Sequence, residues 1–114
     1  MAKTLNFNDI KLLTLHIVLK DEAKTNVHIT APTVDLVERL QSDLPSLQEK
    51  LNKGDKESIE LMYDLAADLI SVNREDIKLN GGQLRNEYKL DIVDLMVFFG
   101  AYLDFIAEIK NAKN

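Results

Sequence analysis

The segment LMVFFGAYLDFIAEI, from Leu95 to Ile109, places the strongest constraint on the fold of this 114-residue chain, because it holds four of the seven aromatic residues. On a helix of about 3.6 residues per turn, one wide apolar face is formed by Leu95, Phe98, Phe99, Tyr102, Phe105, Ile106 and Ile109. Further apolar surface comes from Met96, Val97, Leu103 and Ala107. A helix that is apolar nearly all round is typical of burial on every side. We therefore expect a central core helix here.

A second interpretation of the same helix is that part of it contacts another chain. A domain of this size has little material with which to surround one helix completely. Aromatic and methionine side chains are also enriched in protein interfaces, and the two interpretations are compatible. The residues predicted to bind a partner are Met62, Met96, Phe98, Phe99, Tyr102 and Phe105.

Before this helical region, apolar residues alternate with other residues in residues 13–19 and again in residues 27–31. Period-two alternation predicts two strands of a β-hairpin. One register that matches the apolar faces pairs Leu15 with Ile29 but sets Lys20 opposite Lys24. A register shifted by two residues avoids that repulsion with a longer loop, and both stay open. A lone hairpin is marginally stable, so its apolar face must pack on helices or on another chain.

Helix starts are predicted at three capping residues, Thr33, Asp55 and Asp91, each followed by a helical apolar period. Pro45 is expected to break or kink the first helix, and Gly54 to stop it. The second helix, KESIELMYDLAADLISV, follows Asp55, and the last runs from Asp91 to about residue 110.

Between the second and last helices the pattern is less regular. Asn73 is expected to cap an extra helical turn. The pair Gly81-Gly82 is expected to interrupt the regular secondary structure, and residues 83–90 are expected to form a short helix. The predicted fold class is α+β, mainly helical, with an N-terminal β-hairpin followed by about four helices. A single domain is expected over residues 1–114, with a loose arm (1–10), the hairpin (11–31), the helical part (33–110) and a polar tail (111–114).

Composition narrows the possible partners. Lys and Arg number 14 against 19 Asp and Glu, a formal charge of −5, and an acidic surface repels nucleic-acid phosphates. There is no cysteine, which excludes disulfides, cysteine-ligated zinc and thiol catalysis. The N-terminus lacks a signal-peptide pattern, and the apolar segment is shorter than the roughly 20 residues of a membrane span. We expect a soluble intracellular protein with no nucleic-acid or membrane partner.

The remaining polar residues do not form a catalytic pattern. His16 and His28 become a cross-strand pair in one hairpin register, but zinc needs further protein ligands. Four acidic residues share one face of the second helix, and they form either a solvated face or a patch for a basic partner: Glu57, Glu60, Asp64 and Asp68. There is neither a phosphate-binding glycine loop nor a nucleophile elbow. The chain is therefore predicted to be non-enzymatic and to need no cofactor.

The order of segments resembles a known family. A hairpin ending in ITAPTVDLVERL is followed by an acidic amphipathic helix, by SVNREDI and finally by DIVDLMVFFGAYLDFIAEI. Over residues 11–110 this resembles the tail assembly chaperones of long-tailed bacteriophages and of prophages of Gram-positive bacteria. The resemblance implies a non-enzymatic protein that binds the tape measure protein, keeps it soluble and recruits tail tube subunits. It also implies a location in the cytoplasm of the bacterial host and absence from the mature virion.

Two other functions fit the same pattern. One is a structural phage component such as a head–tail connector subunit, and the other is a small intracellular regulator such as an antitoxin. Self-association at high concentration is also expected, because a two-stranded hairpin has open edges and residues 95–109 carry excess apolar surface.

Overall fold

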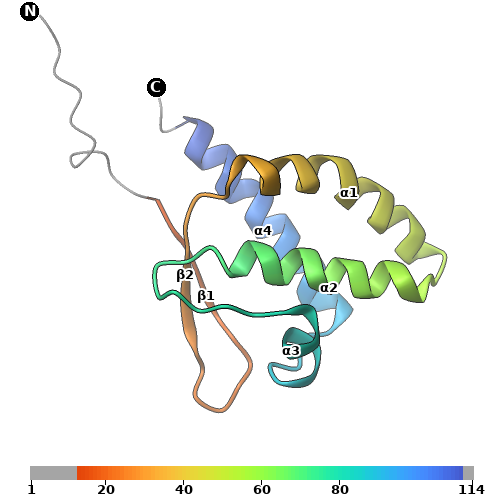
Figure 1. The fold of residues 1–114 in the computed structure, drawn as a ribbon, viewed down its shortest axis with the longest axis horizontal. Helices are drawn as coiled ribbons and strands as arrows, with labels where there is room; N and C mark the ends of the chain where they lie inside the picture. Colours follow the sequence, from red (N-terminus) through yellow and green to blue (C-terminus); the bar gives the residue numbers. More distant parts are fainter. Residues whose placement is uncertain (1–12, 112–114) are drawn as a thin grey trace, which may run out of the picture.

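The computed structural model describes residues 13–111 of the chain. Its elements, in chain order, are β1 (Leu15–Val18), β2 (Asn26–Ile29), α1 (Val34–Asn52), α2 (Lys56–Ile70), α3 (Gly81–Asn86) and α4 (Ile92–Asn111). The predicted class is confirmed: a mainly helical α+β fold in which an antiparallel hairpin precedes four helices (Figure 1). The arm predicted at residues 1–10 and the end of the predicted tail lie outside the described residues.

The hairpin adopts one of the two registers that the sequence left open. Leu15 pairs with Ile29 and His16 with His28. The turn is held by Asp21, which accepts hydrogen bonds from the backbone N–H and the hydroxyl of Thr25. Lys20 is drawn away from Lys24, because its ammonium group donates to the carboxylate of Asp94. These polar contacts offset the repulsion that the shorter loop would otherwise bring.

The free edge of β2 is covered, so the expectation of open edges on both strands is wrong for this strand. The backbone N–H of Thr30 donates to the Val72 carbonyl at 3.0 Å, and that of Arg74 donates to the His28 carbonyl at 2.9 Å. A single bridge also pairs Ile29 with Asn73. The segment that follows α2 thus returns along the sheet and satisfies backbone groups of its outer strand.

The helical turn predicted after Asn73 is also wrong. The amide of Asn73 donates to the carbonyls of Ile70 and Ile77, and its oxygen accepts the N–H of Ile77. A side chain that bonds its own backbone in this way competes with helix formation. The segment is therefore a pinned loop.

Helix α1 passes through Pro45 without a break. Its predicted cap is confirmed, since the hydroxyl of Thr33 accepts the N–H of Leu36. Pro45 lies on the exposed side of the helix, whereas Leu40, Leu44 and Leu47 are buried. Burial of one leucine stripe stabilises the helix enough to tolerate the hydrogen bond lost at proline.

Helix α2 is the central element, since it packs against α1, α3, α4 and β2. Its predicted cap, Asp55, accepts the N–H of Glu57 and the hydroxyl of Ser58. Buried positions recur along it, from Met62 to Ile70. The other helices of the described residues therefore pack around α2 and share one apolar core with it (Figure 1).

The pair Gly81-Gly82 does not break the chain, which corrects the prediction made from glycine content. It begins α3, whose capping box joins Asn80 and Gln83. A Cβ atom at Gly81 would lie 2.3 Å from Oδ1 of Asp64. The glycine is thus needed because α3 approaches α2 closely, a packing constraint that short-range sequence patterns do not contain.

The last helix begins and ends close to where the sequence predicts. Asp91 and Asp94 cap it reciprocally, each carboxylate accepting the other residue's N–H. Within residues 13–111, none of the helices combines the length and the apolar character that crossing a bilayer requires.

Candidate partner-binding surface

Helix α4 is apolar on two opposite faces, and one of them forms the core. Leu95, Phe99, Tyr102 and Phe105 are buried, together with Phe98. The ring of Tyr102 lies 5.6 Å from that of Phe98 and 5.9 Å from that of Phe105, centroid to centroid. These are separations at which aromatic rings attract each other beyond their area of burial. The expectation of a core helix is therefore confirmed for this face.

The opposite face of α4 is exposed although it is apolar. The exposed fractions are 67% for Val93, 49% for Met96, 68% for Val97 and 47% for Leu103. Gly100 and Ala107 are exposed as well. We refer to Val93, Met96, Val97, Gly100, Leu103 and Ala107 as the outer face of α4. Neighbouring large apolar side chains that stay in water mark interaction surfaces more often than scattered ones do.

The outer face is a straight stripe. Val93, Met96, Gly100, Leu103 and Ala107 are separated alternately by three and four residues, which places them in one line along a helix. Such spacing is the pattern that packs against a second helix. The side chains of this stripe are exposed, so no other helix within the described residues covers it.

Five of the six predicted partner-binding residues lie in the interior. Met62, on α2, is 1% exposed, and Phe98, Phe99, Tyr102 and Phe105 are buried as well. The structure therefore brings these side chains together, but in the core. Only Met96 lies on the outer face of α4. Contacts of the other five with a partner would require rearrangement of the fold.

The residues predicted to bind a partner do not include Val93, Val97, Gly100 or Leu103, although the sequence marks Val97 and Leu103 as apolar surface beyond the wide face. Apolar or small residues recur at alternating intervals of three and four along a second side of the helix, and this pattern indicates a second packing face. It was overlooked because aromatic side chains are prominent in interfaces. In a small domain, however, the larger side chains remove more apolar area from water when they fill the core.

Charged groups flank the exposed stripe. At the start of α4, Nζ of Lys20 lies 2.6 Å from Oδ2 of Asp94, and this hydrogen bond raises the pKa of Lys20 and lowers that of Asp94. Further along, Asp104 and Glu108 are exposed and four residues apart, so they lie on the same side of the helix. The stripe is thus bordered by carboxylates over its C-terminal half.

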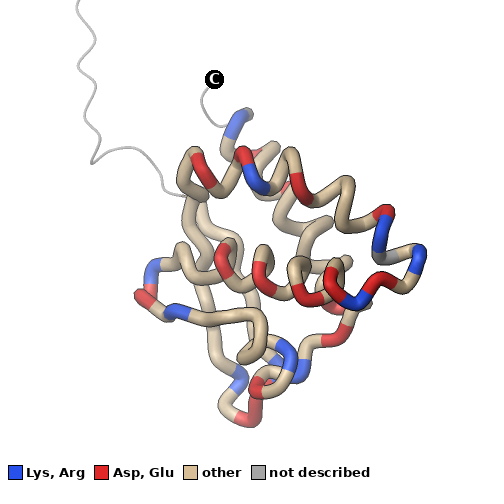
Figure 2. The backbone as a smooth tube through the Cα atoms, turned by 45° about the vertical axis from the view of Figure 1, so that its right-hand side comes forward, with Lys and Arg blue, Asp and Glu red and all other residues tan. Residues whose placement is uncertain are grey.

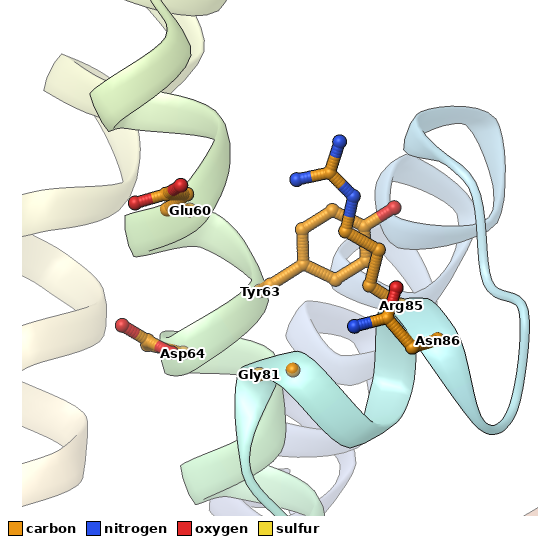
Figure 3. Close-up of a pocket in the computed structure, with 7 residues that line it drawn as sticks. Glu60, Tyr63, Asp64, Gly81, Arg85 and Asn86 are labelled. Atoms are coloured by element: carbon orange, nitrogen blue, oxygen red, sulfur yellow. The ribbon is translucent and has the colours of Figure 1, made fainter.

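A cavity of about 310 Å³ lies between α2 and α3. Glu60 and Asp64 border it from α2 and Arg85 and Asn86 from α3, while the ring of Tyr63 lies between them (Figure 3). The Arg85 guanidinium is 5.8 Å from the centre of that ring. The Tyr63 hydroxyl donates to the Leu90 carbonyl, and burial raises its pKa. These side chains join α3 to α2. The residues that line the cavity carry charges of both signs, but none of them is a nucleophile paired with a base.

A second hollow, of about 240 Å³, lies between α1 and α2. Leu47, Leu61 and Leu65 contribute its apolar lining, and Arg39 and Lys50 are among its charged residues. Arg39 also pairs with Asp68 at 2.6 Å. This ion pair links α1 to α2 beside the hollow, so we interpret the hollow as a gap between two packed helices.

The two histidines form a stacked cross-strand pair on the sheet. Their ring centroids are 4.3 Å apart, and Nδ1 of His28 lies 2.5 Å from Oε2 of Glu75. Glu75 also accepts the backbone N–H of His28, and these hydrogen bonds lower its pKa. The described part of the chain holds no group of three or more side chains arranged to bind a metal ion. The contacts of His28 with Glu75 fasten the loop after α2 to β2, whereas the ring of His16 bonds to Asn26 within the hairpin.

Acidic residues recur along the helices, and many of the basic ones lie in the connections (Figure 2). No protein-family model matches the chain, and neither does any curated protein or solved structure with which it was compared. The candidate surface thus rests on the outer face of α4 and the charges beside it.

Proposed function

We propose that this protein is a non-enzymatic tail assembly chaperone, which binds a helix of the phage tape measure protein on the outer face of α4. The observation that carries the proposal is the exposed apolar stripe from Val93 to Ala107, on a helix whose other side is anchored in the core. An exposed apolar helix face can pack against the apolar face of an amphipathic partner helix.

The resemblance of the segment order to tail assembly chaperones supplies the identity of the partner. A tape measure protein is a long amphipathic helix, whose apolar side needs cover until the tail has assembled. A face of four large exposed apolar side chains can provide that cover without any chemical step. Recruitment of tail tube subunits is the second part of the role that the family implies.

The test is co-expression with the tape measure protein of the same phage or prophage. The tape measure protein should move to the soluble fraction and co-purify with the chaperone. Val97→Asp combined with Leu103→Asp should abolish co-purification, because a charge on the stripe stays hydrated and opposes burial by the partner. Circular dichroism should remain that of the parent protein, since both side chains are exposed.

Leu61→Asp is the matched control, since Leu61 is 53% exposed on a different helix, α2. This variant should still co-purify with the tape measure protein. The proposal is wrong if the tape measure protein stays insoluble beside the parent chain, or if the Leu61 variant loses it to the same degree as the double variant does.

A further inference from the structure

Gly100 is a glycine that the described fold does not require. A Cβ atom placed there would meet no atom within 4 Å. Gly81, by contrast, is required by Asp64, and Gly54 adopts a φ of 78°. Glycine inside a helix is less stable than alanine, and among residues 13–111 no atom lies close enough to Gly100 to require the absence of a Cβ. A glycine of this kind is typical of a site where another backbone approaches closely.

The position of Gly100 points to a crossing helix. It lies in the middle of the outer face of α4, with Val93 and Met96 on one side along the stripe and Leu103 and Ala107 on the other. The stripe spans about four helical turns, or roughly 21 Å at about 1.5 Å per residue. A small residue at the centre of such a stripe lets two helix axes come nearer than larger side chains allow.

The carboxylates beside the stripe indicate which charge the crossing partner helix carries. Asp104 and Glu108 are both exposed, and none of the salt bridges among the described residues involves either one. Two carboxylates four residues apart match two cationic side chains with the same spacing on a neighbouring helix.

A second copy of this chain fits the same border poorly. In a parallel pair of α4 helices, Asp104 and Glu108 would face their own counterparts. In an antiparallel pair centred on Gly100, Glu108 would lie beside the start of the other α4, where the carboxylate of Asp91 is and where that of Asp94 is already paired with Lys20. Both arrangements bring like charges together.

We propose that the outer face of α4 binds an amphipathic helix that crosses at Gly100 and carries two Lys or Arg residues, four apart, beside Asp104 and Glu108. This inference rests on the proposed function and names the chemistry of the partner segment.

Two synthetic helical peptides test the inference, both with the same leucine and alanine stripe. One has lysine at two flanking positions four residues apart, and the other has glutamate there. Fluorescence anisotropy with the purified full chain should show binding of the lysine peptide, and at least about tenfold weaker binding of the glutamate peptide, a difference of about 1.4 kcal/mol.

Two changes in the protein locate the contact. Asp104→Lys combined with Glu108→Lys should weaken binding of the lysine peptide at least about tenfold. The control, Glu57→Lys combined with Glu60→Lys, makes the same change in net charge on an exposed face of α2 and should leave binding within about twofold. Gly100→Leu should abolish binding, while its thermal midpoint stays at or above that of the parent, because the space around this Cβ is open.

Each other outcome overturns the inference. Equal binding of both peptides removes the charge match, and equal loss in both double variants shows non-specific attraction. Failure of both peptides, while the tape measure protein still co-purifies, rejects this partner chemistry but leaves the proposed function in place. A dimer at low micromolar concentration that Gly100→Leu dissociates would make a second copy the occupant.

Discussion

At the residue scale, Tyr102 combines full burial with an unpaired polar atom. Its side chain has no exposed surface, and the hydroxyl lacks a hydrogen-bond partner among the described residues. Burial raises the pKa of this hydroxyl, so it stays protonated and neutral. A buried polar group without a partner lowers the free energy of unfolding by about 1–3 kcal/mol.

Tyr102→Phe is therefore expected to stabilise the protein by about 1 kcal/mol, because it removes the unpaired hydroxyl and keeps the ring. Urea unfolding followed by circular dichroism measures the change. Tyr88→Phe serves as the control, since Tyr88 is only partly buried. A loss of stability in Tyr102→Phe would indicate that the hydroxyl has a partner after all.

Glu75 should make stability depend on pH. Hydrogen bonds from the backbone and ring of His28 lower its pKa below the usual 4.5. Since the folded-state pKa is the lower one, the stabilising effect is present above about pH 4.5 and is lost as the pH falls through the folded-state value. Glu75→Gln should flatten the acid limb of a plot of unfolding free energy against pH. An unchanged acid limb would show that the contact contributes nothing measurable.

At the scale of elements, α4 should respond in opposite ways to charges on its two faces. Phe99→Asp places a carboxylate where the side chain is 1% exposed, and the expected result is an unfolded protein. Val97→Asp changes a side chain that is 68% exposed and should keep the helical spectrum. Circular dichroism and thermal unfolding of the two variants check this. Equal stability of both would contradict the orientation of α4.

The loop after α2 is the element that joins hairpin and helices. It pairs with β2 through Val72 and Arg74 and is pinned by Asn73 and Glu75. A hairpin of two short strands is marginal by itself, and this third segment supplies hydrogen bonds to its outer edge from the backbone and from the Glu75 side chain.

At the scale of the whole molecule, self-association should be weak. One edge of the sheet is covered by the loop after α2, and the exposed stripe on α4 is bordered by carboxylates in a chain of net charge −5. Sedimentation velocity should show a monomer at low micromolar concentration and association at high micromolar concentration. Added salt should strengthen that association, because it screens the repulsion between acidic copies. A dimer that salt dissociates would contradict this prediction.

The sequence by itself determined the fold class and most helix boundaries. Capping residues act within one turn, so Thr33, Asp55 and the pair Asp91 and Asp94 could be identified from local spacing alone. The hairpin followed from alternation, and its register was narrowed to two possibilities by the requirement that apolar faces match.

The tertiary structure decided what depends on contacts between distant residues. Position 81 must be a glycine because Asp64 of α2 lies where a Cβ atom would stand, and the loop through Asn73 lies at the edge of β2. It also decided which side of α4 is buried. Periodicity places residues on faces of a helix but does not state which face a neighbour covers. Here α2 covers the aromatic side, which has the larger area to remove from water, and the stripe through Val93, Gly100 and Leu103 is left exposed.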